Sequence, residues 1–174
     1  PTFGISAVIS SEPSLVSRAI QVNSWICIEV NLSSRATFSE IKIDPTYRDF
    51  KLILAGSTNF FGNELEFNSI KNFIDKNNLE KDIIITGHLS DNNIIDLYSK
   101  AFMYVFPSKS EGFGIPIIES FNAKLPVICS DLEVFREIGK DAILTFNVNS
   151  YKDLAKKIKL IIKSKKTRLE LISK

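Results

Sequence analysis

The chain has 174 residues, of which 44% are hydrophobic and 24% charged, a composition typical of one soluble domain with its own core. It contains no run of about 18 apolar residues and no signal-peptide pattern, which argues against a membrane-spanning or secreted protein. The net charge of +2 is unevenly distributed along the chain. Residues 151–174 hold nine Lys/Arg and two Asp/Glu, whereas residues 1–150 hold thirteen Lys/Arg and eighteen Asp/Glu. The basic residues therefore belong to the C-terminus, and no nucleic-acid-binding surface is predicted.

The first predicted strand holds one of the two cysteines, Cys27, and a later strand holds the other, Cys129. Buried reduced thiols are the first interpretation, and a disulfide between them is the alternative. Reduced thiols favour a cytoplasmic protein.

Short strand-like segments recur along the chain from residue 25. They are rich in β-branched or aromatic residues and are bounded by Gly, Pro, Asn or Ser. These predicted strands are Trp25–Val30, Lys51–Ala55, Asp82–Thr86, Phe102–Phe106, Pro126–Cys129 and Ala142–Thr145. Because they are almost continuously apolar, they predict a sheet that is covered on both faces.

Amphipathic spacing between the strands predicts helices. They are Glu64–Asn77, Asp91–Lys100, Pro116–Ala123 and Tyr151–Ile172. The βαβ order predicts an α/β, Rossmann-like fold with a doubly wound, mostly parallel sheet, which binds ligands at the carboxyl ends of its strands. Residues 1–24 stay unassigned, and Asn31–Phe50 has room for only a short helix near Ala36–Ile41.

A glycine-rich segment, SEGFGIPIIES (Ser110–Ser120), follows the strand Phe102–Phe106. Pro116 suits the first turn of a helix, because its φ is compatible and its missing N–H would be unpaired there. Gly112 and Gly114 allow unusual dihedrals and a close approach of the backbone to a ligand. Their N–H groups and the helix N-terminus together suit a phosphate.

Two carboxylates flank this turn. Glu119 lies one turn inside the predicted helix, where it could accept hydrogen bonds from a diol such as ribose. Glu111 lies on the other side, where a second polyhydroxyl group could bind. A phosphate between two such carboxylates describes a nucleotide sugar, and the alternative is that both glutamates are solvated surface residues.

From about Lys51 to Ile162 the chain resembles the C-terminal half of a family-4 retaining glycosyltransferase of GT-B fold. FPSKSEGFGIPIIES carries the family's E-x7-E signature, and GHLSDNNIIDLYSKA and KLPVICSDLEVFREIGKDAILTFNVNSYKDLAKKI resemble the flanking segments. The resemblance implies that residues 25–174 form a nucleotide-sugar donor-binding domain. It further implies transfer of the sugar to a hydroxyl of a glycan or lipid-linked acceptor.

The resemblance also implies roles for individual residues. Glu119 would hold the ribose, and Glu111 would lie near the sugar as the catalytic candidate. Amides around Phe113, Gly114 and Ile115 would contact the diphosphate or the sugar. The family uses no tightly bound metal or other cofactor, and the donor phosphate would assist the incoming hydroxyl.

Other positions match the family pattern less completely. Gly56 matches a glycine at the donor cleft. The family has an Arg and Lys pair after the first strand of this domain to neutralise the diphosphate. Here Arg35 stands for the Arg, whereas Ala36 occupies the place of the Lys, for which Lys42 is a potential substitute. The family often has glycine where this chain has Lys124.

His88, the only histidine, follows the strand Asp82–Thr86. In the family the loop there lies near the donor base, and the alternative is a solvent-facing histidine. Asp131 and Glu133 follow the strand PVIC, and we expect them to cap a short helix near Val134–Ile138 rather than to reach the cleft. No second His or Cys cluster occurs, so no metal site is predicted.

The last predicted helix carries most of the C-terminal lysines beside an apolar stripe. The basic residues are Lys156, Lys157, Lys159, Lys163, Lys165, Lys166 and Arg168, and the stripe is Leu154, Ile158, Ile161 and Ile162. A solvated outer face is the default interpretation. The alternative is contact with anionic lipid headgroups, peripheral at the inner face of a membrane, which would suit a lipid-linked acceptor.

Three functions remain open from the sequence. The first is the donor-binding half of a glycosyltransferase, whose acceptor domain is expected outside this sequence, so that this chain would bind donor without completing transfer. The second is a non-catalytic nucleotide-sugar-binding module that is degenerate at Ala36. The third is a doubly wound protein-interaction domain without a ligand.

Overall fold

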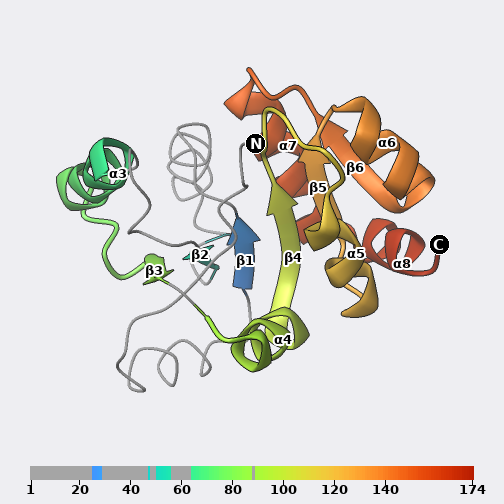
Figure 1. Ribbon diagram of the computed structural model, residues 1–174, viewed down its shortest axis with the longest axis horizontal. Coiled ribbons are helices and arrows are strands. Elements are labelled where there is room, and N and C mark those ends of the chain that lie inside the picture. The colour runs from blue at the N-terminus through green and yellow to red at the C-terminus, as the bar shows by residue number, and fades with distance from the viewer. Residues whose placement is uncertain (1–24, 29–46, 48–49, 56–63, 88) are drawn as a thin grey trace.

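A single parallel sheet runs through the part of the chain described by the computed structural model, namely residues 25–28, 47, 50–55, 64–87 and 89–174 (Figure 1). Its strands agree with the predicted ones to within two residues at each end. They are β1 (Trp25–Ile28), β2 (Lys51–Ala55), β3 (Ile83–Gly87), β4 (Ala101–Phe106), β5 (Val127–Ser130) and β6 (Ile143–Phe146). The predictions for residues 1–24 and for a helix near 36–41 lie outside the described residues.

The strand order is β3-β2-β1-β4-β5-β6, and every neighbouring pair is parallel. All carboxyl ends therefore lie at one edge of the sheet, toward which β1 and β4 point in Figure 1. After β3 the chain returns across the sheet and adds β4 on the free side of β1, so the direction of winding reverses between β1 and β4. A doubly wound sheet binds ligands at such a reversal, outside the carboxyl ends. The predicted Rossmann-like fold is confirmed.

The strands with described side chains alternate these side chains between the two faces of the sheet, as a period of two requires. In β4, Met103 and Val105 belong to one cluster, and Tyr104 and Phe106 belong to the other. The helices cover these two faces. They are α3 (Glu64–Lys76), α4 (Asp91–Lys100), α5 (Ile115–Asn122), α6 (Glu133–Gly139), α7 (Tyr151–Lys163) and α8 (Lys165–Ile172), with a 3-10 turn, η2, at Lys140–Ala142.

Each face has its own helices. Side chains of α3, α7 and α8 pack in the cluster with Met103, whereas side chains of α4, α5 and α6 pack in the cluster with Tyr104. The expectation of a sheet covered on both faces is therefore confirmed. None of the helices in the described ranges has the combination of length and hydrophobicity that a membrane span requires.

The prediction of one long C-terminal helix is wrong, because the helix breaks at Ser164. Ser164 has an extended backbone, and its hydroxyl accepts a hydrogen bond from the N–H of Thr167 at 3.1 Å, which starts α8. Arg168 then turns inward, where its Nη1 donates to the carbonyls of Ile161 at 2.6 Å and Ile162 at 3.0 Å. These carbonyls at the end of α7 are thereby satisfied without a continuing helix.

Arg168 is consequently not part of a solvated basic face. Its guanidinium also lies 4.7 Å from the ring centroid of Phe102 in β4, a cation–π contact. The apolar stripe of α7 packs as predicted, with Leu154, Ile158 and Ile161 all at 0% exposure.

Cys129 confirms the expectation of a buried free thiol. Burial in the core, and secondarily the neighbouring carboxylate of Asp131, raises the pKa of the Cys129 thiol to about 12. The side chain of Cys27 lies outside the description, so its state stays a prediction.

Replacing Ile158 by Ala should lower the free energy of unfolding by about 2–5 kcal/mol, because it leaves a cavity in the core. Leu160, two positions further along α7, is 43% exposed and provides the matched control. Leu160→Ala should change the stability by only about 0.5 kcal/mol. Urea unfolding of both variants measures the difference, and equal losses would contradict the orientation of α7.

Cys129 should resist alkylation by iodoacetamide at pH 8 in the native protein, because the thiolate is the reactive form and its population is negligible there. Peptide mapping by mass spectrometry should find this residue alkylated only after unfolding in urea. Stoichiometric alkylation in native buffer would show that the strand β5 is more accessible than its burial indicates.

Candidate functional site

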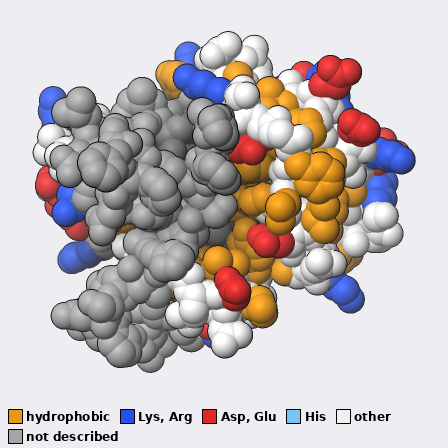
Figure 2. Space-filling model, viewed as in Figure 1, with side chains coloured by type: hydrophobic (Ala, Val, Ile, Leu, Met, Phe, Trp, Pro, Cys, Tyr) orange, Lys and Arg blue, Asp and Glu red, His pale blue; other side chains and the backbone are white. Residues whose placement is uncertain are grey.

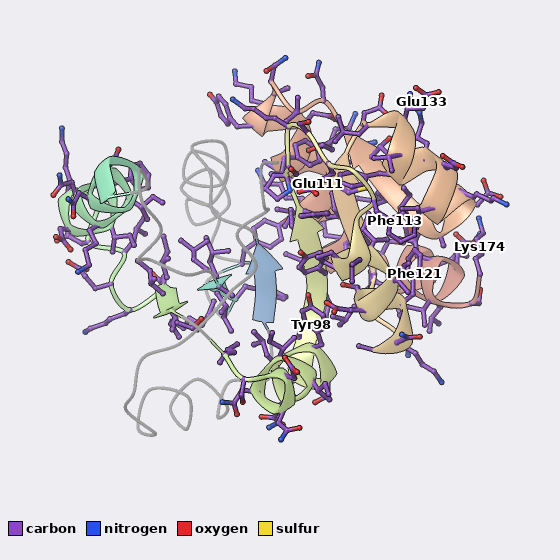
Figure 3. The ribbon with its side chains drawn as sticks, in the orientation of Figure 1. Tyr98, Glu111, Phe113, Phe121, Glu133 and Lys174 are labelled. Carbon is purple, nitrogen blue, oxygen red and sulfur yellow. The ribbon has the colours of Figure 1, made fainter. Side chains whose placement is uncertain are left out.

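The candidate site is the loop of residues 107–114, which leaves the carboxyl end of β4 next to the reversal point of the sheet. Figure 3 shows Glu111 above the end of β4 and Phe113 further along toward α5. The loop therefore brings Glu111, Gly112, Phe113 and Gly114 to the edge where a doubly wound sheet binds ligands. Five of the predicted site residues thus lie in a row, since Ile115 follows as the first residue of α5.

Glu111 is held by a hydrogen bond within the loop. The hydroxyl of Ser108 lies 2.9 Å from Oε1 of Glu111 and 3.1 Å from the carbonyl oxygen of Ser110. The donated proton restrains the carboxylate, which is half-buried. The sequence analysis did not predict this role of Ser108, although a Ser three positions before a loop Glu was the available signal.

Gly114 is required by the backbone that starts α5. Its φ of 105° lies in the left-handed region, and a Cβ atom there would lie 2.9 Å from Cε1 of Phe135. Both facts exclude residues with a side chain. Gly112 differs, because its φ lies outside this region and a Cβ would meet nothing within 4 Å. Of the two glycines that allow unusual dihedrals, only Gly114 therefore has a left-handed backbone.

The start of α5 exposes backbone donors. Gly114 is its N-cap, Pro116 is in its first turn as predicted, and no side chain caps the helix. The N–H of Ile115 therefore has no intrahelical partner, and the positive end of the helix dipole lies here. This end of α5 can stabilise a negatively charged group.

Glu119 projects from the exposed side of the same helix. It makes no side-chain hydrogen bond or ion pair with the residues that the structure describes. The opposite side of α5 is anchored, since Ile117 and Ser120 are completely buried and the Ser120 hydroxyl donates to the carbonyl of Pro116 at 2.7 Å. The helix thus presents Glu119 one turn after the free N–H of Ile115.

Exposed apolar side chains accompany the two carboxylates. Phe113 is 54% exposed and Ile115 is 61% exposed, and Ile118 adds to the same surface. Figure 2 shows hydrophobic side chains gathered on this part of the molecule, with acidic side chains at their edge. This surface suits a ligand with both apolar and hydroxyl-bearing faces.

The remaining predicted site residues, Arg35, Gly56 and His88, lie outside the described residues. The register pairs Ala55 with Gly87, the last residues of β2 and β3. The roles of Arg35, Gly56 and His88 stay predictions.

The prediction that Asp131 and Glu133 cap the short helix is wrong. The N-cap of α6 is Leu132, which offers no side-chain hydrogen bond, and Glu133 is the first helical residue and exposed. Asp131 instead forms an ion pair with Arg136, with 2.5 Å between Oδ1 and Nη1. The guanidinium of Arg136, five positions downstream, thus takes the carboxylate that was expected to accept from backbone N–H groups.

Among the residues that the structure describes, no group of three or more His, Cys, Asp or Glu side chains could hold a metal ion. The expectation of a site without a tightly bound metal stays a prediction, because three of the candidate positions lie outside that part of the chain.

Comparison with known proteins identifies the family to which the chain belongs. Residues 36–174 match the family described as Glycosyl transferases group 1. Over 83 residues the chain is 40% identical to the O-antigen chain mannosyltransferase RfbU of Salmonella typhimurium, covering 48% of this chain and 24% of that protein. The matches span between 10% and 31% of the length of the curated relatives.

Solved structures show the same fold. The crystal structure of the C-terminal domain of the glycosyl transferase group 1 family protein LpcC from Francisella tularensis has a TM-score of 0.70 and 21% identity, covering 95% of this chain and 89% of that one. Anabaena HepE in complex with UDP and glucose has a TM-score of 0.76 and 18% identity, covering 94% of this chain and 46% of that one. The chain thus has the Rossmann-like fold of one half of a GT-B glycosyltransferase.

Gly114→Ala should lower the free energy of unfolding by about 2 kcal/mol or more, because it combines left-handed backbone strain with overpacking against Phe135. Gly112→Ala is the matched control in the same loop and should cost about 0.5 kcal/mol or less. Thermal and urea unfolding measure both. A larger loss for Gly112→Ala would refute the assigned conformations.

Proposed function

The chain belongs to the glycosyl transferases group 1 family, and from this premise we propose that residues 25–174 form the nucleotide-sugar donor-binding domain of a family-4, retaining glycosyltransferase. The observation that carries the proposal is the loop after β4. There, Ser108 restrains Glu111, while Gly114 starts α5 so that Glu119 follows one turn later. Hydroxyl-binding carboxylates on both sides of free backbone N–H groups match the order of ribose, diphosphate and sugar.

The proposal assigns a role to each part of this loop. Glu119 accepts hydrogen bonds from the ribose, and Glu111, restrained by Ser108, lies beside the sugar as the catalytic candidate. The amides around Phe113, Gly114 and Ile115 contact the diphosphate or the sugar. Exposure of Glu119 supports its assignment, because its carboxylate is available to a ligand.

The segments after β1, β2 and β3 complete the proposed donor site. Gly56 permits close approach of the donor, and His88 lies near the base. Arg35 supplies positive charge to the diphosphate. A helix N-terminus offers only about half an elementary charge, so a full cation is needed to balance a diphosphate between two carboxylates.

The proposed reaction transfers a hexose with retention of configuration. The bond between the anomeric carbon and the donor phosphate breaks, the acceptor oxygen bonds to the same carbon, and the hydroxyl proton passes to the departing phosphate. A tightly bound metal is not required, since the cation and the helix N-terminus stabilise the leaving diphosphate. The acceptor, a glycan or a lipid-linked glycan, binds to a further domain beyond this sequence.

Mannose is the first candidate for the transferred sugar, because RfbU is named a mannosyltransferase. The nucleotide of the donor is a separate question from the sugar. HepE was crystallised with UDP and glucose, so a UDP-sugar is a candidate donor beside a GDP-sugar. Donor choice within this site would depend on side chains near Glu111 and on the segment of His88.

Ala36 supports a second candidate function, a nucleotide-sugar-binding module without catalytic activity. The resemblance places a lysine there, and its loss would weaken stabilisation of the departing diphosphate more than binding of the intact donor. Turnover by the full-length protein would favour the enzyme, whereas binding without turnover would favour the module.

A thermal-shift panel of UDP-, GDP- and ADP-sugars should identify one nucleotide that raises the melting temperature of this chain. At 100 times its dissociation constant a ligand stabilises the folded state by roughly 2.7 kcal/mol. Glu119→Gln should lose most of the shift, whereas Glu137→Gln, a change of another exposed glutamate on α6, should keep it. Absence of a shift with every donor would reject the donor-binding function, and an undiminished shift in Glu119→Gln would reject the role of Glu119.

A further inference from the structure

A groove lies at the edge of the sheet opposite to the proposed donor site. It has a volume of about 580 Å³ and is bounded by the end of α5, the end of α6, the turn η2 and α8. Leu125 and Ala142, which line it, precede β5 and β6, so the groove lies at the amino ends of these strands. Figure 3 shows two other lining residues, Phe121 on α5 and Lys174 after α8.

The groove combines an apolar floor with a basic rim. The floor is formed by Phe121, Leu125, Ile138, Ala142, Leu171 and Ile172. The rim carries three lysines, Lys124, Lys140 and Lys174, and a single carboxylate, Asp141. Within the described part of the chain neither Lys124 nor Lys140 has an ion-pair partner, and both are exposed. Two uncompensated ammonium groups therefore face solvent beside apolar surface.

Lys124 occupies a position where glycine is expected. The N–H of Lys124 donates a hydrogen bond to the carbonyl of Phe121 at 2.9 Å. The N–H of Leu125 donates a hydrogen bond to the carbonyl of Ser120, also at 2.9 Å. This pair of bonds is the Schellman motif, whose central residue is left-handed and usually glycine. Lys124 adopts a φ of 55° there, a conformation that costs free energy for a residue with a side chain.

Lys140, at the end of α6, also has a positive φ, of 43°, but its ψ of −119° lies outside the left-handed helical region. In the described residues only three non-glycine positions have a positive φ, and the third is Asn78, a residue type that tolerates it. Both lysines with a strained backbone thus line one groove. Two strained lysines on one groove suggest the hypothesis that their side chains have a function there.

We propose that this groove binds an anionic membrane lipid, with the phosphate of the headgroup between Lys124 and Lys140 and the first part of its alkyl chain on the apolar floor. The charge of the rim is complementary to a phosphate, and the volume suits a headgroup with part of a chain. A free inorganic anion would leave the apolar floor unused. The proposal does not depend on the proposed donor site.

The structure also favours the groove over α7 as the lipid contact. The apolar stripe of α7 is buried in the core, so it is not available to a membrane as the sequence alone suggested. On α8, which borders the groove, Lys165 and Lys166 are exposed beside Leu169, which is 57% exposed. The groove lies at the other edge of the sheet from Glu111, so a lipid bound there serves for attachment and is not the acceptor.

Co-sedimentation with vesicles tests the proposal. The chain should bind vesicles of phosphatidylcholine that contain phosphatidylglycerol and not vesicles of phosphatidylcholine alone. The double variant Lys124→Gly, Lys140→Gly should lose binding by about tenfold or more. Glycine relieves the backbone strain at both positions, so this variant should melt no lower than the wild type.

Lys152→Ala with Lys156→Ala provides the matched control, since it removes the same charge from exposed positions of α7 away from the groove. It should retain most of the binding. Equal losses in the two double variants would mean that only the total charge matters and would overturn the proposal, as would a wild-type chain that ignores phosphatidylglycerol.

Calorimetric titration separates the lipid from its headgroup. Dihexanoyl phosphatidylglycerol, below its micelle concentration, should bind the wild type at least about tenfold more tightly than glycerol 3-phosphate, because its chains cover the apolar floor. Equal affinity for the two compounds, or binding of inorganic phosphate alone, would overturn the assignment of a lipid.

Discussion

Burial of both faces of the sheet is the constraint on which this structure depends. In β4, for example, Met103 and Val105 face one helical layer, while Tyr104 and Phe106 face the other, so neither face of this strand is solvated. Parallel strands require crossover connections, and those from β2 to β6 run through the helices α3, α4, α5 and α6. Parallel strands place all their carboxyl ends at one edge, and the helix N-termini that follow lie at the same edge.

One aromatic contact at that edge holds the two ends of the candidate-site loop in place. Phe135 is completely buried and lies 5.0 Å from Phe106, measured between ring centroids, and its ring also occupies the space beside Gly114 where a Cβ would lie. The contact joins β4, the loop and α6 next to the residue at which α5 begins. The loop can thus expose Phe113 and the backbone N–H groups while its ends remain fixed, which lowers the entropic cost of binding a ligand there.

The helix α5 connects the two edges of the sheet. A residue with positive φ lies at each of its ends, and this residue is a glycine at one end and a lysine at the other. At Gly114 the neighbouring ring leaves no space for a side chain, so glycine is required. At Lys124 the side chain is exposed, so lysine is tolerated at the cost of backbone strain of about 1–2 kcal/mol. One chain segment therefore presents backbone donors at the carboxyl edge and a cation at the amino edge, and the two surfaces are separated by the length of the strands.

The sequence by itself determined the strands, the order of elements and the helix at Pro116, because hydrophobic periodicity and proline chemistry are local properties. It also placed Glu111, Gly114 and Glu119 around one turn, since their spacing along the chain is short. Only the tertiary structure decided features that depend on distant residues: the break at Ser164 with Arg168 turned onto Phe102, the partner of Asp131, and the need for glycine at residue 114 but not at residue 112. The groove beneath Lys124 and Lys140 belongs to the same class, because its walls come from segments that are adjacent only after the sheet has formed.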